Sequence, residues 1–167
     1  MKKLLVVVDM QNDFITGTLG TKEAQALVPC IVDYIKCFDG DVIATMDTHY
    51  DDYLDTQEGK KLPVVHCIKD TEGWLLNKDI GNLVDRRVLK NTFGSTKLGE
   101  IIAAEEFEEV HFVGVCTGIC VISNAIIAKS FNPDARIVIY KDLCACVTPE
   151  SHDRALKSME TLQMDII

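Results

Sequence analysis

The chain has 167 residues, a hydrophobic fraction of 47% and a formal net charge of -9 at pH 7. This size suits one domain, residues 1–167, with a sizeable buried core. The negative charge argues against a nucleic-acid or anionic-membrane partner, because like charges repel.

The first apolar run covers residues 4–8 and is interrupted by Asp9. It is too short for a signal peptide, and no run is long enough to cross a bilayer. The seven cysteines are odd in number and irregularly spaced, which argues against a disulfide framework. We therefore expect a cytoplasmic protein with reduced thiols.

Apolar patterning predicts strands and helices that alternate along the chain. The predicted strands are residues 4–8, 41–45, 86–89, 109–115 and 136–140, with a short terminal strand at 165–167. Helical spacing covers residues 22–38, 98–106 and 117–130, and a last helix begins at Pro149 with Thr148 as its N-cap. The polar segment 47–70 has no clean period.

This alternation predicts a three-layer α/β domain, with a mostly parallel, doubly wound sheet flanked by helices. In such sheets, sites lie beyond the carboxyl ends of the strands. Functional side chains should therefore follow strands rather than precede them. The residues that pass this test are Asp9, Asp47, His49, Lys90, Cys116 and Cys120.

Cys120 falls in the first turn of a predicted helix, where backbone N–H groups stabilise a thiolate or an oxyanion. Asp9 is a candidate general base for that thiol, and Lys90 would favour the ionised forms of both. Taken singly, the three would be a core cysteine, a loop cap and a surface lysine. Together they favour a cysteine nucleophile.

Asp47, His49 and His66 have the residue types of a metal site. An Asp-x-His pair points two ligands to the same side of an extended chain. Carboxylate and imidazole ligands suit Zn, Fe or Mn. An acidic, solvated loop with two ordinary histidines explains the Asp47 and His49 pair equally well.

Four further residues are interpreted as structural. His111 starts a predicted strand, at the end opposite the expected site. His152, in the first turn of the last helix, is expected on the surface rather than in catalysis, although that turn could approach the site. Cys144 and Cys146 flank Ala145 in a loop, and no second cysteine pair stands at a metal-binding spacing. We interpret both cysteines as packing residues.

Several short motifs, in order along most of the chain, resemble the isochorismatase-like cysteine hydrolases, and within them the nicotinamidase (pyrazinamidase) subgroup. The motifs are Asp9-Met10-Gln11-Asn12-Asp13-Phe14, Asp47-x-His49, His66-Cys67, Lys90-x-x-Phe93-x-Ser95 and Gly114-Val115-Cys116-Thr117-x-x-Cys120-Val121. Two positions depart from the pattern. Gly118 stands where many relatives have Asp, and Thr48 stands where many nicotinamidases have Trp.

The resemblance implies one divalent metal ion, with Zn expected before Fe or Mn. The implied ligands are Asp47, His49, Glu58 and His66. It also implies a cis peptide bond between Val115 and Cys116, and an oxyanion hole made by the backbone N–H groups of Cys116 and Cys120.

We therefore hypothesise an amidohydrolase that converts nicotinamide to nicotinate and ammonia through a Cys120 thioester. Apolar candidates for the substrate walls are Phe14, Leu19, Trp74 and Phe93. One alternative is a family hydrolase acting on another small amide, and another is a catalytically silent metal-binding or scaffold domain. We expect a small-molecule partner and a homo-oligomer.

Overall fold

Six parallel strands form the centre of the computed structural model, which describes all 167 residues. Their order in the sheet is β3-β2-β1-β4-β5-β6. The strands are β1 Lys3–Val8, β2 Asp41–Asp47, β3 Arg86–Lys90, β4 Glu109–Val115, β5 Arg136–Ala145 and β6 Asp165–Ile166. The longer helices are α2 Lys22–Cys37, α5 Thr96–Glu105, α6 Ile122–Phe131 and α7 Pro149–Thr161. The short ones are α1 Asn12–Ile15, η1 Tyr53–Asp55, α3 Gln57–Lys61, α4 Lys78–Gly81 and the π-helical turn η2 Thr117–Val121.

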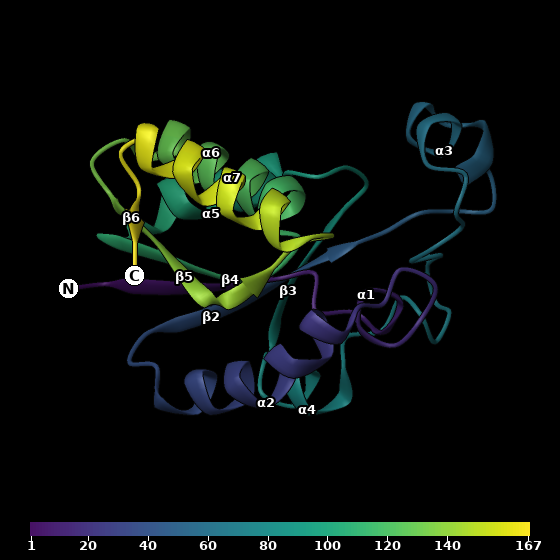
Figure 1. Cartoon of the computed structure of the whole chain (residues 1–167). Coiled ribbons are helices and arrows are strands. Elements are labelled where there is room, and N and C mark those ends of the chain that lie inside the picture. Colours follow the sequence, from purple (N-terminus) through teal and green to yellow (C-terminus); the bar gives the residue numbers. More distant parts are fainter.

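The helices cover both faces of the sheet, so the predicted three-layer α/β architecture is confirmed (Figure 1). Helices α5, α6 and α7 lie on one face, and α2 and α4 lie on the other. The segment that carries α3 extends away from the sheet, at the end opposite the two chain termini. None of the helices combines the length and apolar character needed to cross a bilayer.

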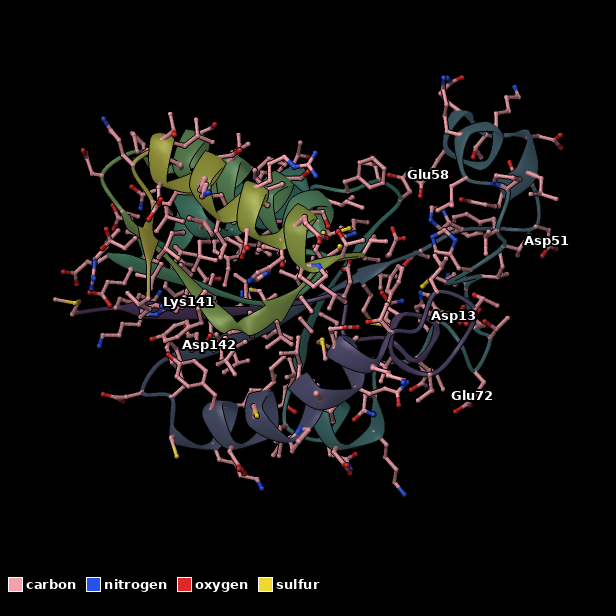
Figure 2. The ribbon with its side chains drawn as sticks, in the orientation of Figure 1. Asp13, Asp51, Glu58, Glu72, Lys141 and Asp142 are labelled. Carbon is pink, nitrogen blue, oxygen red and sulfur yellow. The ribbon has the colours of Figure 1, made fainter.

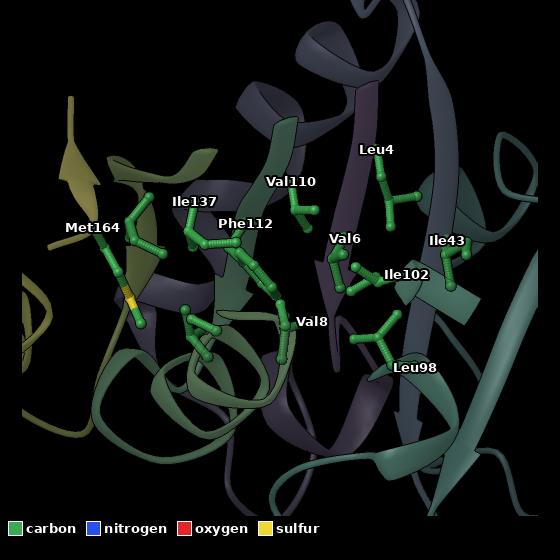
Figure 3. Packing of buried hydrophobic residues seen from close by; sticks show 14 of the residues in the cluster. Leu4, Val6, Val8, Ile43, Leu98, Ile102, Val110, Phe112, Ile137 and Met164 are labelled. Carbon is green, nitrogen blue, oxygen red and sulfur yellow. The ribbon is translucent and has the colours of Figure 1, made fainter. Parts of the chain in front are cut away.

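Strand β1 lies between β2 and β4, and helices cover both of its faces, so residues 4–8 are fully buried. Side chains alternate along a strand, so Leu4, Val6 and Val8 point to one face and Leu5 and Val7 to the other. The first set packs against residues of α5 and α6 (Figure 3). The second set packs against residues of α2. A continuous apolar run is thus what a central parallel strand requires.

Two element boundaries differ from the sequence prediction. Strand β5 continues to Ala145 rather than ending near Tyr140, and its pairing with β4 shifts register between Phe112 and Gly114. Cys144 therefore lies within a strand rather than in a loop. The helix predicted from residue 117 opens as the π-helical turn η2, and α6 follows from Ile122.

The start of α7 matches its prediction. The Thr148 hydroxyl accepts a hydrogen bond from the Ser151 backbone N–H, and the Ser151 hydroxyl accepts one from the Thr148 backbone N–H. Pro149 occupies the first helical turn, where its missing N–H is not needed. This capping box fixes the chain direction just after the end of β5.

Candidate active site

The carboxyl ends of four neighbouring strands bring the candidate catalytic side chains together. Asp9 follows β1, Asp47 and Lys90 end β2 and β3, and Cys120 lies in η2 after β4. Asp47 and Lys90 are direct register partners across the β2–β3 pair. The strand-end rule therefore located the group correctly.

Asp9 is fully buried, and its carboxylate is held from one side by Thr45. The Thr45 hydroxyl donates to Asp9 Oδ1 at 2.7 Å, and the Asp9 backbone N–H donates to the Thr45 carbonyl. Asp9 has a positive φ of 49°, a conformation that Asp tolerates better than most residues. Its other carboxylate oxygen, Oδ2, accepts no hydrogen bond. That oxygen faces the Lys90 ammonium in a buried ion pair.

Lys90 links the carboxylate to the thiol. Its Nζ lies 2.6 Å from Asp9 Oδ2, off the hydrogen-bond direction, and 3.6 Å from Cys120 Sγ. Nζ also lies 3.4 Å from Asp47 Oδ1 and donates to the Thr92 carbonyl at 3.1 Å. The ammonium is thus surrounded by acceptors and negative groups.

Burial controls the protonation of this group. It raises the pKa of Cys120 well above its ordinary value, and the Asp9 charge raises it further. Burial also raises the pKa of Asp9, although Lys90 opposes that shift. Burial lowers the pKa of Lys90, but the charges of its neighbours, Asp9 first, outweigh burial and raise the pKa overall. At neutral pH the resting site therefore holds a neutral thiol and an ammonium, so the thiol needs a base to become nucleophilic.

Beside this group, four side chains converge on one point. Asp47, His49, Glu58 and His66 offer ligand atoms that all lie within 4.8 Å of one another. His49 Nε2 is 3.0 Å from Asp47 Oδ2 and 3.6 Å from Glu58 Oε1. Two imidazole nitrogens and two carboxylate oxygens form a donor set that suits Zn, Fe or Mn.

The orientation of His66 supports a ligand arrangement. Its Nδ1 lies 2.7 Å from the Val64 carbonyl, which can only accept, so Nδ1 carries the proton. Nε2, 3.5 Å from Asp47 Oδ2, is left to present a lone pair. Glu58 comes from α3, on the segment that projects from the sheet (Figure 2). Three donors are therefore buried and the fourth is partly exposed.

A cavity of about 330 Å³ opens above the thiol and the four-donor group. Cys120, Asp47, Glu58 and His66 border it, whereas Asp9 and Lys90 lie behind its wall. The remaining lining residues are Phe14, Leu19, Thr21, Ala24, Leu62, Phe93, Val115, Cys116, Ile119, Ala145, Cys146 and Val147. Most of this lining is apolar, which favours a small ring or aliphatic group over a highly charged ligand.

Three of the four predicted wall residues, Phe14, Leu19 and Phe93, line the cavity. The prediction for Trp74 was wrong, because Trp74 is not among the lining residues. Its indole N–H donates to the Thr48 hydroxyl at 2.9 Å, behind the four-donor group. An isolated Trp in a polar segment gave no periodicity from which its direction could be read.

Two fully buried amides, Gln11 and Asn124, hold the site in place and were not predicted. Gln11 Oε1 accepts from the Asp47 backbone N–H at 2.7 Å, and its Nε2 donates to the Asp47 carbonyl at 2.8 Å. Asn124 Nδ2 donates to the Cys120 carbonyl at 2.8 Å. The spacing of four between Cys120 and Asn124 in a helix was a usable signal, because such residues share a helix face.

The family model described as "Isochorismatase domain" matches residues 3–167 of this chain. The chain belongs to the isochorismatase family of hydrolases. Nicotinamidase from Saccharomyces cerevisiae is 30% identical over 82% of this chain and 86% of its own. The crystal structure of nicotinamidase/pyrazinamidase from Bacillus subtilis covers 99% of both chains at 27% identity, with a TM-score of 0.88. That of pyrazinamidase from Pyrococcus horikoshii in complex with zinc covers 100% of this chain and 99% of that one at 25% identity, with a TM-score of 0.84.

The cis peptide bond between Val115 and Cys116, which the resemblance implied, is confirmed. Two positions differ from the family pattern. Thr48, which stands where many nicotinamidases have Trp, is buried and hydrogen-bonded to Trp74, so an indole reaches this position from another segment. Gly118, which stands where many relatives have Asp, lies beside Cys146, and a Cβ there would be 3.4 Å from the Cys146 sulfur.

The residues interpreted as structural lie as follows. His111 is buried in β4, with its Nε2 2.9 Å from Glu109, away from the candidate active site. Cys144 is buried in the core. His152 Nδ1 is 2.8 Å from the Thr117 hydroxyl, so it is half-buried rather than simply exposed. Cys146 borders the cavity and is not only a packing residue.

Proposed function

We propose that this isochorismatase-family hydrolase is a metal-containing cysteine amidohydrolase that converts nicotinamide to nicotinate and ammonia. The observation that carries the proposal is the position of Lys90 Nζ, 2.6 Å from Asp9 Oδ2 and 3.6 Å from Cys120 Sγ, directly behind a small apolar cavity. The names of the yeast and Bacillus subtilis relatives support the choice of a carboxamide substrate.

The first half of the reaction forms a thioester. Asp9 Oδ2 takes the Cys120 thiol proton as sulfur attacks the carboxamide carbon. The developing oxyanion is stabilised by backbone N–H groups of Cys116 and Cys120, which both border the cavity. When the C–N bond breaks, Asp9 returns the proton to the leaving ammonia. Lys90 stays an ammonium throughout and compensates the charge that passes between Asp9 and Cys120.

The second half releases the acid. Asp9 is a carboxylate again and accepts a proton from the attacking water, whose oxygen adds to the thioester carbon. The tetrahedral intermediate collapses to nicotinic acid, and the Cys120 thiolate leaves and regains its proton from Asp9. The released acid loses its own proton to ammonia or water and becomes nicotinate. The raised pKa of Asp9, caused by its burial, makes it a stronger base than an exposed aspartate in both steps.

The residues that would hold the divalent metal are Asp47, His49, Glu58 and His66, whose mixed donor set and close spacing fit such an ion. When bound, the ion supplies a Lewis-acidic position for a heteroatom of the substrate, such as a pyridine nitrogen. The chain's own residues then complete the orientation, because Phe14, Leu19 and Phe93 border the same cavity. Zinc is the favoured ion, in keeping with the zinc named for the Pyrococcus horikoshii pyrazinamidase.

The direct test measures ammonia and nicotinate released from nicotinamide by purified protein supplied with zinc, iron or manganese. Wild type should turn over, and Cys120→Ala should reduce the rate to background. Cys30→Ala is the matched control, because Cys30 is exposed on α2, away from the cavity. Equal release by wild type and Cys120→Ala would remove Cys120 from the mechanism.

A panel of other small carboxamides separates this proposal from its relatives in the family. The panel should include carboxamides whose rings differ in size from that of nicotinamide, because Thr48 stands where many nicotinamidases have Trp. Turnover of another amide without turnover of nicotinamide would keep the amidohydrolase and change its substrate. A silent scaffold would show no turnover at all and no unusually reactive thiol.

A further inference from the structure

Cys116 and Cys146 form a close pair of free thiols in the wall of the cavity. Their sulfur atoms are 2.7 Å apart. The pair follows from the sheet register, since Val115 and Ala145 are partners across β4 and β5 and the two cysteines come next. Neither thiol is used in the proposed hydrolysis, although the backbone of Cys116 is.

The backbone spacing at this position suits a covalent link. Adjacent strands lie about 4.8 Å apart, and disulfide-bonded cysteines have Cα atoms about 4.4–6.8 Å apart. Closing the bond requires the two sulfurs to approach one another by well under an ångström, with the strands left in place. The other cysteines have no such partner: Cys30 and Cys37 are exposed on α2, and Cys144 donates to a backbone carbonyl.

Cys146 is buried, at 8% exposure, but it lies between two hollows of the surface. It borders the cavity and also a second hollow of about 290 Å³, lined in part by Gly118 and Ser151. Gly118 carries no side chain to cover the sulfur, and a Cβ there would already be 3.4 Å from it. The departure from the family pattern at Gly118 therefore leaves one side of Cys146 open.

The surroundings also favour a reactive sulfur on Cys146. The Cys116 thiol donates its hydrogen to Cys146 Sγ. Burial alone would raise the pKa of Cys146, but hydrogen bonds from Cys116 and Ser151 outweigh it and lower the pKa below the ordinary thiol value. Burial and the neighbouring sulfur raise the pKa of Cys116. One thiol is thus suited to react first and the other to act as its partner.

We propose that Cys116 and Cys146 are a redox-active dithiol, a modification site that a hydroperoxide oxidises to a disulfide in the cavity wall. The Cys146 thiol gives up its proton and attacks one peroxide oxygen as a thiolate. The O–O bond breaks, the attacked oxygen stays on sulfur as a sulfenic acid, and the other oxygen takes that proton and leaves as water or an alcohol. Cys116 sulfur then attacks the sulfenic sulfur, the S–S bond forms and the S–O bond breaks, and the leaving hydroxide takes the Cys116 proton to become water. The two thiols lose two electrons and the peroxide gains them.

The disulfide would also reduce hydrolysis, an effect that rests on the proposed function. The new bond ties Cys116, whose backbone N–H is a proposed oxyanion donor, to the end of β5. It also changes the wall of the cavity that Phe14 and Leu19 line. We expect kcat/KM for nicotinamide to fall at least about tenfold, since small displacements of reacting groups are costly, and to recover with dithiothreitol.

The test treats the metal-loaded protein with graded hydrogen peroxide, alkylates the remaining thiols after denaturation and maps the peptides by mass spectrometry. We expect a cross-linked pair of peptides containing Cys116 and Cys146, lighter by two hydrogens, while Cys144 remains alkylated. Dithiothreitol should restore both thiols. Oxidation of Cys120 to a sulfinic acid, with Cys116 and Cys146 still alkylated, would overturn the proposal.

Two variants sharpen the result. Cys146→Ser keeps a small polar group but cannot form the bond, so its inactivation by peroxide should no longer be reversed by dithiothreitol. Cys30→Ser should behave as wild type. The peptide map does not depend on turnover, so a protein that fails to hydrolyse nicotinamide still tests the dithiol. A mapped disulfide with unchanged kcat/KM would support the site and refute its effect on hydrolysis.

Discussion

Lys90 Nζ lies 2.6 Å from Asp9 Oδ2, and the two side chains are 1% and 0% exposed. An ion pair removed from water is stable only while both charges are present, because each alone would carry an uncompensated cost of desolvation. The proposed base and the ammonium beside it therefore serve stability as well as chemistry. The two roles can be separated experimentally.

The first prediction concerns this pair. Asp9→Asn and Lys90→Met should each lower the free energy of unfolding by about 3–5 kcal/mol, because each leaves one buried charge unpaired. The double variant should lose less free energy of unfolding than the two single variants lose together, because it leaves neither charge unpaired. Urea unfolding of all four proteins measures the coupling. Strictly additive losses would contradict it.

A control for the pair comes from the surface. Arg86 and Glu105 form an ion pair whose side chains are 42% and 30% exposed. Arg86→Met should change the free energy of unfolding by about 0–1 kcal/mol, because water already screens the charges. It should leave turnover unchanged.

The second prediction concerns pH. Burial raises the pKa of Asp9 above its ordinary value of 3.8, and only the carboxylate form can accept the thiol proton. Activity should therefore be full above the raised pKa, and kcat/KM should fall as pH decreases through it. Thr45→Val removes a hydrogen bond that lowers this pKa, so its acid limb should lie at higher pH than that of wild type. An unmoved limb in Thr45→Val would show that another group titrates.

The third prediction concerns the four-donor group. Glu58→Gln should weaken zinc binding at least about tenfold, because a neutral amide is a poorer ligand than a carboxylate. Asp51→Asn makes the same chemical change at an exposed position near the same segment, outside the donor group, and should bind zinc as wild type does. Metal content after equilibrium dialysis against limiting zinc compares the two. Equal zinc content in both variants would exclude Glu58 as a ligand.

The fourth prediction concerns Asn124. Its amide bonds the Cys120 and Phe93 carbonyls and the Ser95 backbone N–H. Asn124→Ala should lower the free energy of unfolding by about 1–3 kcal/mol or more, because buried polar groups lose their partners. It should also lower kcat/KM, because the segment carrying Cys120 loses a support.

Asn132 provides the comparison. Asn132 lies just beyond the carboxyl end of α6, far along the helix from Cys120, and its side chain donates to the Phe107 carbonyl. Asn132→Ala should reduce stability but leave kcat/KM of the folded protein unchanged. Parallel losses of kcat/KM in both variants would show that Asn124 acts only through general stability.

Much of the architecture could be predicted because the strands carry strong local signals. The run at residues 4–8 is apolar throughout, and such runs suit strands buried on both faces. Once the sheet is parallel, topology alone brings residues such as Asp9, Lys90 and Cys120 to one edge. Their proximity therefore depends on fold class rather than on fine packing.

Features that depend on long-range contacts could not be predicted in this way. Charged residues at Lys141 and Asp142 hid the continuation of β5, which is fixed only by pairing with β4. The direction of Trp74 depends on a hydrogen bond to Thr48, from a segment 26 positions away. The helices between β2 and β3 are only three to five residues long, too short to show an apolar periodicity, although Ile80 of α4 is buried in the core.

The central place of β1 gives the two sides of the cavity different mechanical properties. Asp9, behind the cavity wall, continues a strand whose apolar residues are fully buried, so this side of the site is held by close packing. Glu58 belongs to a short helix that projects beyond the sheet and keeps contact with solvent. Adaptation to substrates of different shape should therefore come from the α3 side, while the residues that perform the chemistry stay fixed by the packing around β1.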